Sequence, residues 1–301
     1  MQAFRVLLVG WAVFATTLGT WSDVEPVVFA SAHAQTSIAP VAGAYADIPG
    51  ARIYYTDSGG SGTAVVFMHA GTGSSLVWEY QRPAFVGAGY RFIAYDRLGY
   101  GRSAISPPGS QPGAVADDLE ALMKYLRIER FHLVGTAAGG IVSLDYALSY
   151  PQRLRSLVIA NSIGGVQDDE YVAMGRRLRP SPQFNAMPPD FRELGPSYRA
   201  ENPQGTARWI ELEELSRAST PLATPQRMRN RITWSLLETI KVPTLLLTGD
   251  ADLFTPPAIL RLFSARIRTS ASVIVPEAGH SAYWERPEMF NRAVLDFVRQ
   301  H

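Results

Sequence analysis

Short apolar runs alternate with longer amphipathic segments along most of this 301-residue chain, and this alternation constrains its fold more than any other feature. The short runs lack polar alternation, which is typical of parallel strands buried on both faces. An N-terminal hairpin and six such runs predict eight strands. These strands span residues 44–48, 52–57, 64–69, 91–95, 131–135, 157–160, 243–248 and 272–275. Segments with helical spacing lie between them, so we expect an α/β fold with a mostly parallel eight-stranded sheet and helices on both faces.

Residues 163–237 interrupt this alternation. The segment is rich in Arg and Pro, contains no strand candidate, and has helical patterns at 209–215 and 228–237. A helical insertion in an α/β sheet is expected to lie over it as a lid. The predicted core is therefore formed by residues 35–162 and 238–301, with residues 163–237 as a helical lid or cap.

The N-terminus has the pattern of a secretory signal peptide. Arg5 precedes an apolar run from Val6 to Leu18, and Ala32-His33-Ala34 offers a small-x-small cleavage site. We expect residues 1–34 to be removed and the protein to be secreted or periplasmic, without stable membrane association. An uncleaved N-terminal membrane anchor is the alternative, because Asp23 and Glu25 separate the apolar run from the cleavage site.

Composition removes several classes of function. The chain has no cysteine, so disulfides, a thiol nucleophile and thiolate metal sites are excluded. Basic and acidic residues nearly balance, at 28 and 27, and no basic stripe indicates a nucleic-acid partner. No phosphate-binding glycine loop or histidine cluster calls for a cofactor or a metal. We expect a small-molecule substrate and a monomer or homodimer.

A glycine-flanked turn carries the sharpest local signal. Gly135-Thr136-Ala137-Ala138-Gly139 lies between a predicted strand and an amphipathic helix. This is the context of the nucleophile elbow G-x-S-x-G, in which the central residue occupies a strained turn at the end of the sheet. Here the centre is Ala137 rather than serine. A tight Gly-rich turn that packs a helix on a strand would produce the same pattern.

Two later turns supply an acid and a histidine in the order expected of a catalytic triad. Asp252 follows the predicted strand 243–248, and His280 follows the strand 272–275. With Ala137 they give the chain order nucleophile, acid, base. Asp250 is a rival for the acid.

Two further motifs complete a resemblance to a known family. Residues 69–75, His-Ala-Gly-Thr-Gly-Ser-Ser, are similar to the H-G-G-P-G-S-S turn of the α/β-hydrolase superfamily, and residues 96–103 are similar to its D-x-x-G-x-G-x-S segment. With the elbow and the histidine turn, the chain resembles the lidded branch of esterases, lactonases and proline iminopeptidases. Ala70 and Ala137 depart from the pattern.

The resemblance implies a role for each matching residue. Asp252 would orient His280, which would act as general base and then as general acid. The backbone N–H groups of Gly71 and Ala138 would form an oxyanion hole. Alanine at position 137 cannot attack a carbonyl, so the chain as written should form no acyl-enzyme.

Three accounts of Ala137 stay open. In the first, a deliberate serine-to-alanine change inactivates a hydrolase of carboxylic esters or lactones and leaves substrate bound but unreacted. In the second, His280 and Asp252 act without a nucleophile, as in the cofactor-free oxygenases of the superfamily, where the pair removes a substrate proton and oxygen reacts with the carbanion. In the third, the chain is a non-catalytic ligand-binding protein on the same fold.

The substrate pocket is expected at the carboxyl ends of the strands, under the lid. Trp78, Tyr198 and Trp209 are the candidate substrate-binding residues, although each could equally belong to an apolar core. The predicted lid also carries many arginines, including Arg176, Arg177, Arg179, Arg192 and Arg199. One that faced inward would favour a substrate with a free carboxylate.

Overall fold

The computed structural model describes residues 43–103, 111–179, 182–217 and 226–301. All of them belong to one structural unit, Pro40–His301. The predicted signal peptide lies outside the described residues, so its cleavage and the secretion of the protein stay predictions. Within the described part of the chain, no helix is both long and apolar enough to cross a bilayer.

The sheet has eight strands in the order β1-β2-β4-β3-β5-β6-β7-β8, which confirms the predicted fold class. β1 and β2 form the antiparallel hairpin, β2 pairs antiparallel with β4, and the other pairs are parallel. The strands are β1 Ala44–Ile48, β2 Ala51–Asp57, β3 Ala64–Met68, β4 Arg91–Tyr95, β5 Phe131–Thr136, β6 Leu154–Ala160, β7 Thr244–Gly249 and β8 Ser270–Val275.

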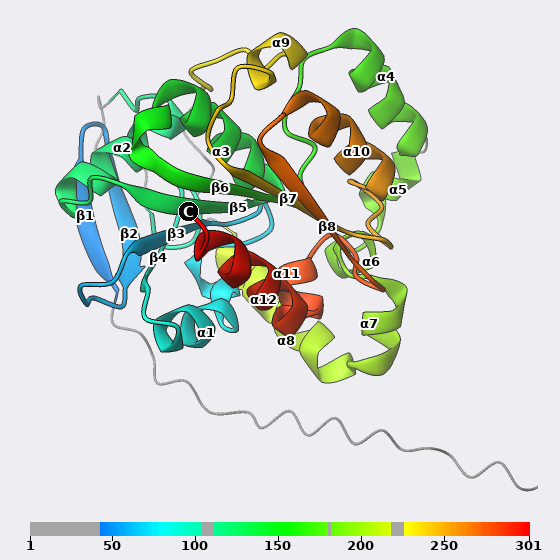
Figure 1. Ribbon diagram of the computed structural model, residues 1–301. Helices are drawn as coiled ribbons and strands as arrows, with labels where there is room; N and C mark the ends of the chain where they lie inside the picture. The colour runs from blue at the N-terminus through cyan, green and yellow to red at the C-terminus, as the bar shows by residue number, and fades with distance from the viewer. Residues whose placement is uncertain (1–42, 104–110, 180–181, 218–225) are drawn as a thin grey trace, which may run out of the picture. The chain divides into compact units, whose positions relative to one another are not determined.

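Helices cover both faces of this sheet (Figure 1). One layer contains α2 Val115–Tyr125, α3 Ala138–Ser149 and α10 Pro257–Arg266. The opposite layer contains α1 Gln81–Gly87, α8 Pro203–Ser216, α11 Ala282–Glu285, α12 Pro287–Val298 and the 3-10 turn η1 Ser75–Trp78. A second 3-10 turn, η2 Pro151–Arg153, leads into β6.

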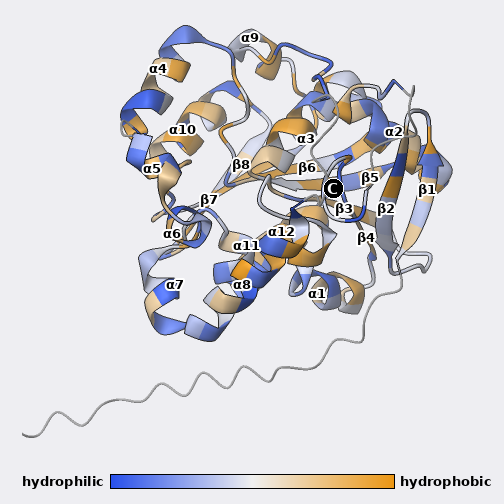
Figure 2. Cartoon of the chain, turned by 180° about the vertical axis from the view of Figure 1, so that it is seen from behind, coloured by the Kyte–Doolittle hydropathy of each residue, from blue (hydrophilic) through white to orange (hydrophobic). Residues whose placement is uncertain are grey.

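The parallel strands are apolar on both faces because each face packs against one helix layer. In β3, Val65 and Phe67 join one buried cluster, whereas Val66 and Met68 join the other. Each such side chain contributes roughly 1.5–3 kcal/mol by leaving water. Figure 2 shows hydrophobic residues concentrated along the strands and hydrophilic ones on outer helices such as α7, Pro196–Glu201. This two-sided burial explains why the strands could be found from sequence.

The segment between β6 and β7 contains helices and, among its described residues, no strand. Besides α7 and α8 these are α4 Asp169–Leu178, α5 Pro182–Ala186, α6 Pro189–Glu193 and α9 Trp234–Leu237. The helix predicted at 228–237 is wrong except for α9. The backbone N–H groups of Arg229 and Asn230 instead donate to the carboxylate of Asp145 on α3, at 2.9 and 2.8 Å, which holds this stretch non-helical against the core.

Candidate active site

The glycine-flanked turn forms a strained elbow at the end of β5. Ala137 has φ 49° and ψ −117°, a conformation that few residues other than glycine adopt. A Cβ on Gly139 would lie 2.3 Å from the carbonyl oxygen of Met68, and one on Gly135 would lie 2.3 Å from Oγ of Ser143. Both flanking positions therefore exclude any larger residue, because the start of α3 packs so closely on β5 and on the end of β3.

Neighbouring residues hold the strained elbow in place. The N–H of Ala137 donates to the carbonyl of Ala160 at 2.9 Å, and the hydroxyl of Ser162 donates to the carbonyl of Ala137 at 2.7 Å. A backbone in such a region costs about 1–3 kcal/mol and persists only when its surroundings determine it. The two nearby hydroxyls do not replace the missing nucleophile: Thr136 is fully buried, and the Ser143 hydroxyl donates to the Gly139 carbonyl at 2.8 Å.

His280 and Asp252 form a buried pair. Nδ1 of His280 lies 2.9 Å from both carboxylate oxygens of Asp252. The carboxylate also accepts the backbone N–H groups of Phe254 and Thr255, each at 2.8 Å. Since Nδ1 donates to the acid, Nε2 of the imidazole is left as the proton acceptor.

The electrostatics of the pair favour its charged form. Burial by itself lowers the pKa of His280, but the charge and hydrogen bond of Asp252 outweigh this effect and raise the pKa above the usual value. Burial likewise acts to raise the pKa of Asp252, whereas His280, Asn161 and the Thr255 N–H together lower it below the usual value. An imidazole with a raised pKa next to a fixed carboxylate suits a general base.

Asp250 does not compete for the histidine. Its Oδ1 accepts the backbone N–H of Glu277 at 2.7 Å, on the exposed side of the turn. The carboxylate of Asp250 therefore joins the turn after β7 to the turn after β8, while Asp252 contacts the imidazole.

Asn161 joins the elbow to the pair, and sequence reasoning missed it. Its side-chain amide donates to Asp252 and to the carbonyl of Gly279, each at 3.0 Å. It lies between Ala160 and Ser162, the two residues that hold Ala137, and it has φ 47°. An asparagine directly after a predicted strand could have indicated this position in the sequence, because asparagine tolerates positive φ. Position 137, Asp252 and His280 are thus brought to one edge of the sheet around Asn161.

Glu285 positions the histidine loop and was also missed. Its buried carboxylate accepts the N–H groups of Gly279 and Ser281, which flank His280, at 2.9 and 3.1 Å. It also accepts the N–H of Gly195, from the helical insertion, at 2.8 Å. Burial raises the pKa of Glu285 to about 7 against these hydrogen bonds. One carboxylate therefore ties the insertion to both neighbours of the histidine.

Glu193 brings the insertion into direct contact with His280. The N–H of His280 donates to the carbonyl oxygen of Glu193 at 2.7 Å. The Glu193 side chain is buried as well, and burial raises the pKa of its carboxyl.

The two predicted oxyanion-hole residues lie side by side. A Cβ on Gly71 would be 3.7 Å from Cβ of Ala138. Ala138 begins α3, where the first N–H groups of a helix have no intrahelical acceptor. Asp96 holds the end of the turn that carries Gly71, because its carboxylate accepts the N–H groups of Ser75 and Arg102 at 2.6 and 2.8 Å.

The predicted substrate-binding residues lie in the apolar cluster on one face of the sheet. Trp78 is 1% exposed and packs against Phe67 and Tyr283, while Tyr198 and Trp209 are 4% and 3% exposed. Their contact with substrate stays a prediction. Within the described residues, no group of three or more His, Asp or Glu side chains could hold a metal ion.

A family model and two hydrolases of known sequence match most of this chain. The model of the alpha/beta hydrolase family matches residues 65–293. A 2-hydroxy-6-oxo-6-phenylhexa-2,4-dienoate hydrolase of Comamonas testosteroni is 28% identical, covering 84% of this chain and 93% of the relative. A putative carbamate hydrolase RutD of Caulobacter sp. (strain K31) is 32% identical, covering 82% and 95%.

Solved structures share the fold of this chain. A thermophilic esterase of Thermogutta terrifontis, determined with malate bound, has a TM-score of 0.71 and 26% identity, covering 85% of this chain and 98% of the esterase. The eight-stranded sheet, the elbow and the histidine loop thus agree with the match over residues 65–293. This chain belongs to the alpha/beta hydrolase family, and its relatives are hydrolases.

Proposed function

We propose that this protein is a serine-type hydrolase of carboxylic esters or lactones in which alanine occupies the position of the nucleophile. In this form it binds its substrate and does not cleave it. Asp252 and His280 are the acid and base of the triad, and the N–H groups of Gly71 and Ala138 form the oxyanion hole.

The conformation of Ala137 carries this proposal. Alanine gains nothing from φ 49°, because its methyl group makes no hydrogen bond that would repay the strain. In a hydrolase, the same strain presents a serine Oγ to the substrate and to the histidine. The elbow, its two glycines and the buried His280–Asp252 pair support a site arranged for a nucleophile that this chain lacks.

With serine at position 137 the reaction would follow the usual acyl-transfer route. Oγ attacks the carbonyl carbon as His280 Nε2 accepts its proton, and the two N–H groups stabilise the tetrahedral oxyanion. Collapse of this intermediate breaks the bond to the alkoxy group, which leaves as an alcohol with the proton from His280. Water then attacks the acyl-enzyme by the same steps and releases the acid.

Restoring the nucleophile tests the proposal. We expect Ala137→Ser to hydrolyse p-nitrophenyl acetate or butyrate, or a γ-lactone, up to about 10⁶-fold faster than the unchanged chain. The double variant Ala137→Ser with His280→Ala should lose this gain. Because the relatives are named as dienoate and carbamate hydrolases, the assay should include a vinylogous 1,5-diketone and a carbamate. An Ala137→Ser protein that is folded yet inert toward all of these acyl substrates would contradict the proposal.

The intact His280–Asp252 pair favours a second candidate, a cofactor-free oxygenase. Such an enzyme needs a base with an orienting acid and no nucleophile, and the raised pKa of His280 fits that role. Oxygen uptake by the unchanged chain on a heteroaromatic hydroxyketone would support it. Tight ligand binding that His280→Ala does not affect, with no turnover, would instead favour a binding protein.

A further inference from the structure

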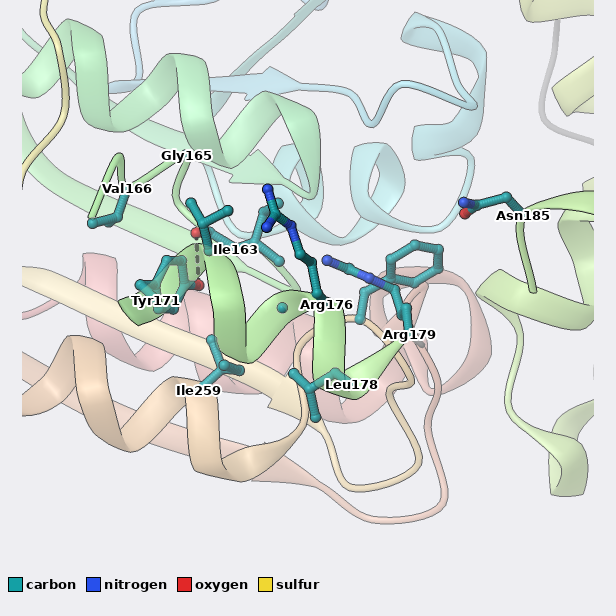
Figure 3. A pocket seen from close by; sticks show the side chains of 12 residues that line it. Ile163, Gly165, Val166, Tyr171, Arg176, Leu178, Arg179, Asn185 and Ile259 are labelled. Atoms are coloured by element: carbon teal, nitrogen blue, oxygen red, sulfur yellow. Dashed lines mark hydrogen bonds between the residues drawn. The ribbon is translucent and has the colours of Figure 1, made fainter. Parts of the chain in front are cut away.

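A pocket of about 300 Å³ lies between α4, α5 and the loops that follow β6 and β7 (Figure 3). Ile163, Val166 and Ile259 give it apolar walls. Phe254 also lines it, and this residue belongs to the loop that carries Asp252. The pocket therefore borders the loop of the proposed catalytic acid.

Two arginines give this pocket a positive charge. Arg176 and Arg179 both line it, and none of the described residues that line it is acidic. Arg176 lies in the last turn of α4 and Arg179 is the capping residue directly after it, and Figure 3 shows both guanidinium groups on the same side of this helix. No acidic residue in the described part of the chain forms an ion pair with either. Paired guanidinium groups without a carboxylate partner suit a carboxylate ligand, which each can bind in a bidentate manner.

The stability of α4 alone does not require arginines that line the pocket. Cations in the last turn of a helix interact favourably with its macrodipole, and Arg177 supplies such a charge in α4 without lining the pocket. Arg177 is thus a matched reference for the helix-terminus effect, while Arg176 and Arg179 add a charge directed at the pocket.

Arg179 lies close enough to His280 for both to contact one substrate molecule. The guanidinium carbon of Arg179 is 5.2 Å from the ring centroid of Phe254, and that ring is 4.5 Å from the imidazole of His280. The guanidinium carbon is therefore within about 10 Å of the imidazole centroid. A short carbon chain spans such a distance between a bound carboxylate and a carbonyl group next to His280.

We propose that this pocket binds the free carboxylate of the substrate, so that the protein acts on monoesters of short dicarboxylic acids or on lactones that carry a carboxylate. Arg176 and Arg179 bind the carboxylate, and the apolar walls contact the chain that links it to the ester. This inference rests on the proposed function, because it places the scissile carbonyl at position 137.

Binding to the unchanged chain tests the subsite without any reaction. By isothermal titration calorimetry at pH 8, we expect monomethyl adipate to bind about tenfold or more tightly than dimethyl adipate, since hydrogen bonds between charged groups are worth that much. Arg176→Ala combined with Arg179→Ala should abolish the difference between the two esters. Arg177→Ala, which makes the same substitution on the same helix, should preserve the difference. Equal binding of the two esters, or a preference that survives the double substitution, would overturn the proposal.

Kinetics separate this proposal from the function on which it rests. In the Ala137→Ser protein, the double arginine substitution should raise KM for the monoester far more than KM for the diester, whereas Arg177→Ala should change neither KM nor kcat. If Ala137→Ser cleaves both esters with equal kcat/KM, the hydrolase stands and the carboxylate subsite is wrong. If the unchanged chain binds the monoester through the arginines but Ala137→Ser cleaves neither ester, the subsite stands and the hydrolase proposal is wrong.

Discussion

Replacing Glu285 with glutamine should displace His280, because the Glu285 carboxylate holds both neighbours of this histidine. The two oxygens accept N–H groups from Gly195, Gly279 and Ser281 at 2.8–3.1 Å. Glutamine keeps one oxygen and turns the other into an NH₂ group, which is a donor. At least one buried N–H then faces a donor in place of an acceptor.

The size of the expected destabilisation follows from the number of buried N–H groups that lose their acceptor. A buried donor left without its partner costs about 1–3 kcal/mol, so we expect the free energy of unfolding to fall by about this amount in Glu285→Gln. For a unit of this size each kcal/mol lowers the melting temperature by about 2–4 °C. In the Ala137→Ser protein, kcat should fall as well, because the loop that carries His280 is no longer fixed on both sides.

Glu288→Gln is the matched control. Glu288 lies three residues further along the chain, in the first turn of α12, and is exposed. It forms no ion pair with another described residue. We expect its unfolding free energy to change by less than about 1 kcal/mol, because an exposed acidic side chain in the first turn of a helix contributes about 0.3–1 kcal/mol. Thermal melts followed by circular dichroism, with ester hydrolysis in the Ala137→Ser background, measure both effects. If Glu285→Gln melts and turns over like Glu288→Gln, the carboxylate does not position the histidine loop.

Two further predictions concern the elbow and the His280–Asp252 pair. Gly139→Ala should destabilise the protein by about 1–3 kcal/mol or more in urea unfolding, because its Cβ meets the Met68 carbonyl, which cannot move freely. Gly87→Ala is the control and should be neutral or slightly stabilising, since there is open space around its Cβ. Equal effects of the two substitutions would contradict the packing argument. In the Ala137→Ser protein, Asp252→Asn should lower kcat about 10⁴-fold and, by NMR titration, lower the pKa of His280. Since the folded-state pKa of His280 is raised, its contribution to the free energy of unfolding is complete below about pH 6.5 and is lost as the pH rises through the folded-state pKa. Asp252→Asn should remove this pH dependence. If stability depends on pH in the same way after the substitution, Asp252 does not raise the pKa of His280.

The sequence by itself determined the sheet and indicated the candidate residues at the carboxyl ends of its strands. Runs such as Val65–Met68 are apolar on both faces because helices cover both sides of a parallel sheet, and that burial is visible residue by residue. Gly135 and Gly139 indicated the elbow for an equally local reason, since no larger residue fits there. The order of Ala137, Asp252 and His280 then gave the candidate site.

Only the tertiary structure decided which residues connect these parts. Asp250 and Asp252 are alike in sequence, and the fold alone turns one toward His280 and the other toward Glu277. Asn161 and Glu285 carry no motif of their own, because their importance comes from hydrogen bonds to residues distant in the chain or on neighbouring turns.

The same limit applies to the helical insertion. Asp145 holds residues 229 and 230 in a non-helical path although their local pattern favours a helix, since charge-assisted hydrogen bonds to a fixed carboxylate outweigh a weak helix preference. The sequence likewise placed several arginines in this segment, but only packing against the loops after β6 and β7 directs Arg176 and Arg179 into a pocket. Local patterns record what each residue prefers among its neighbours in sequence, whereas contacts between distant residues depend on the packing of the whole unit.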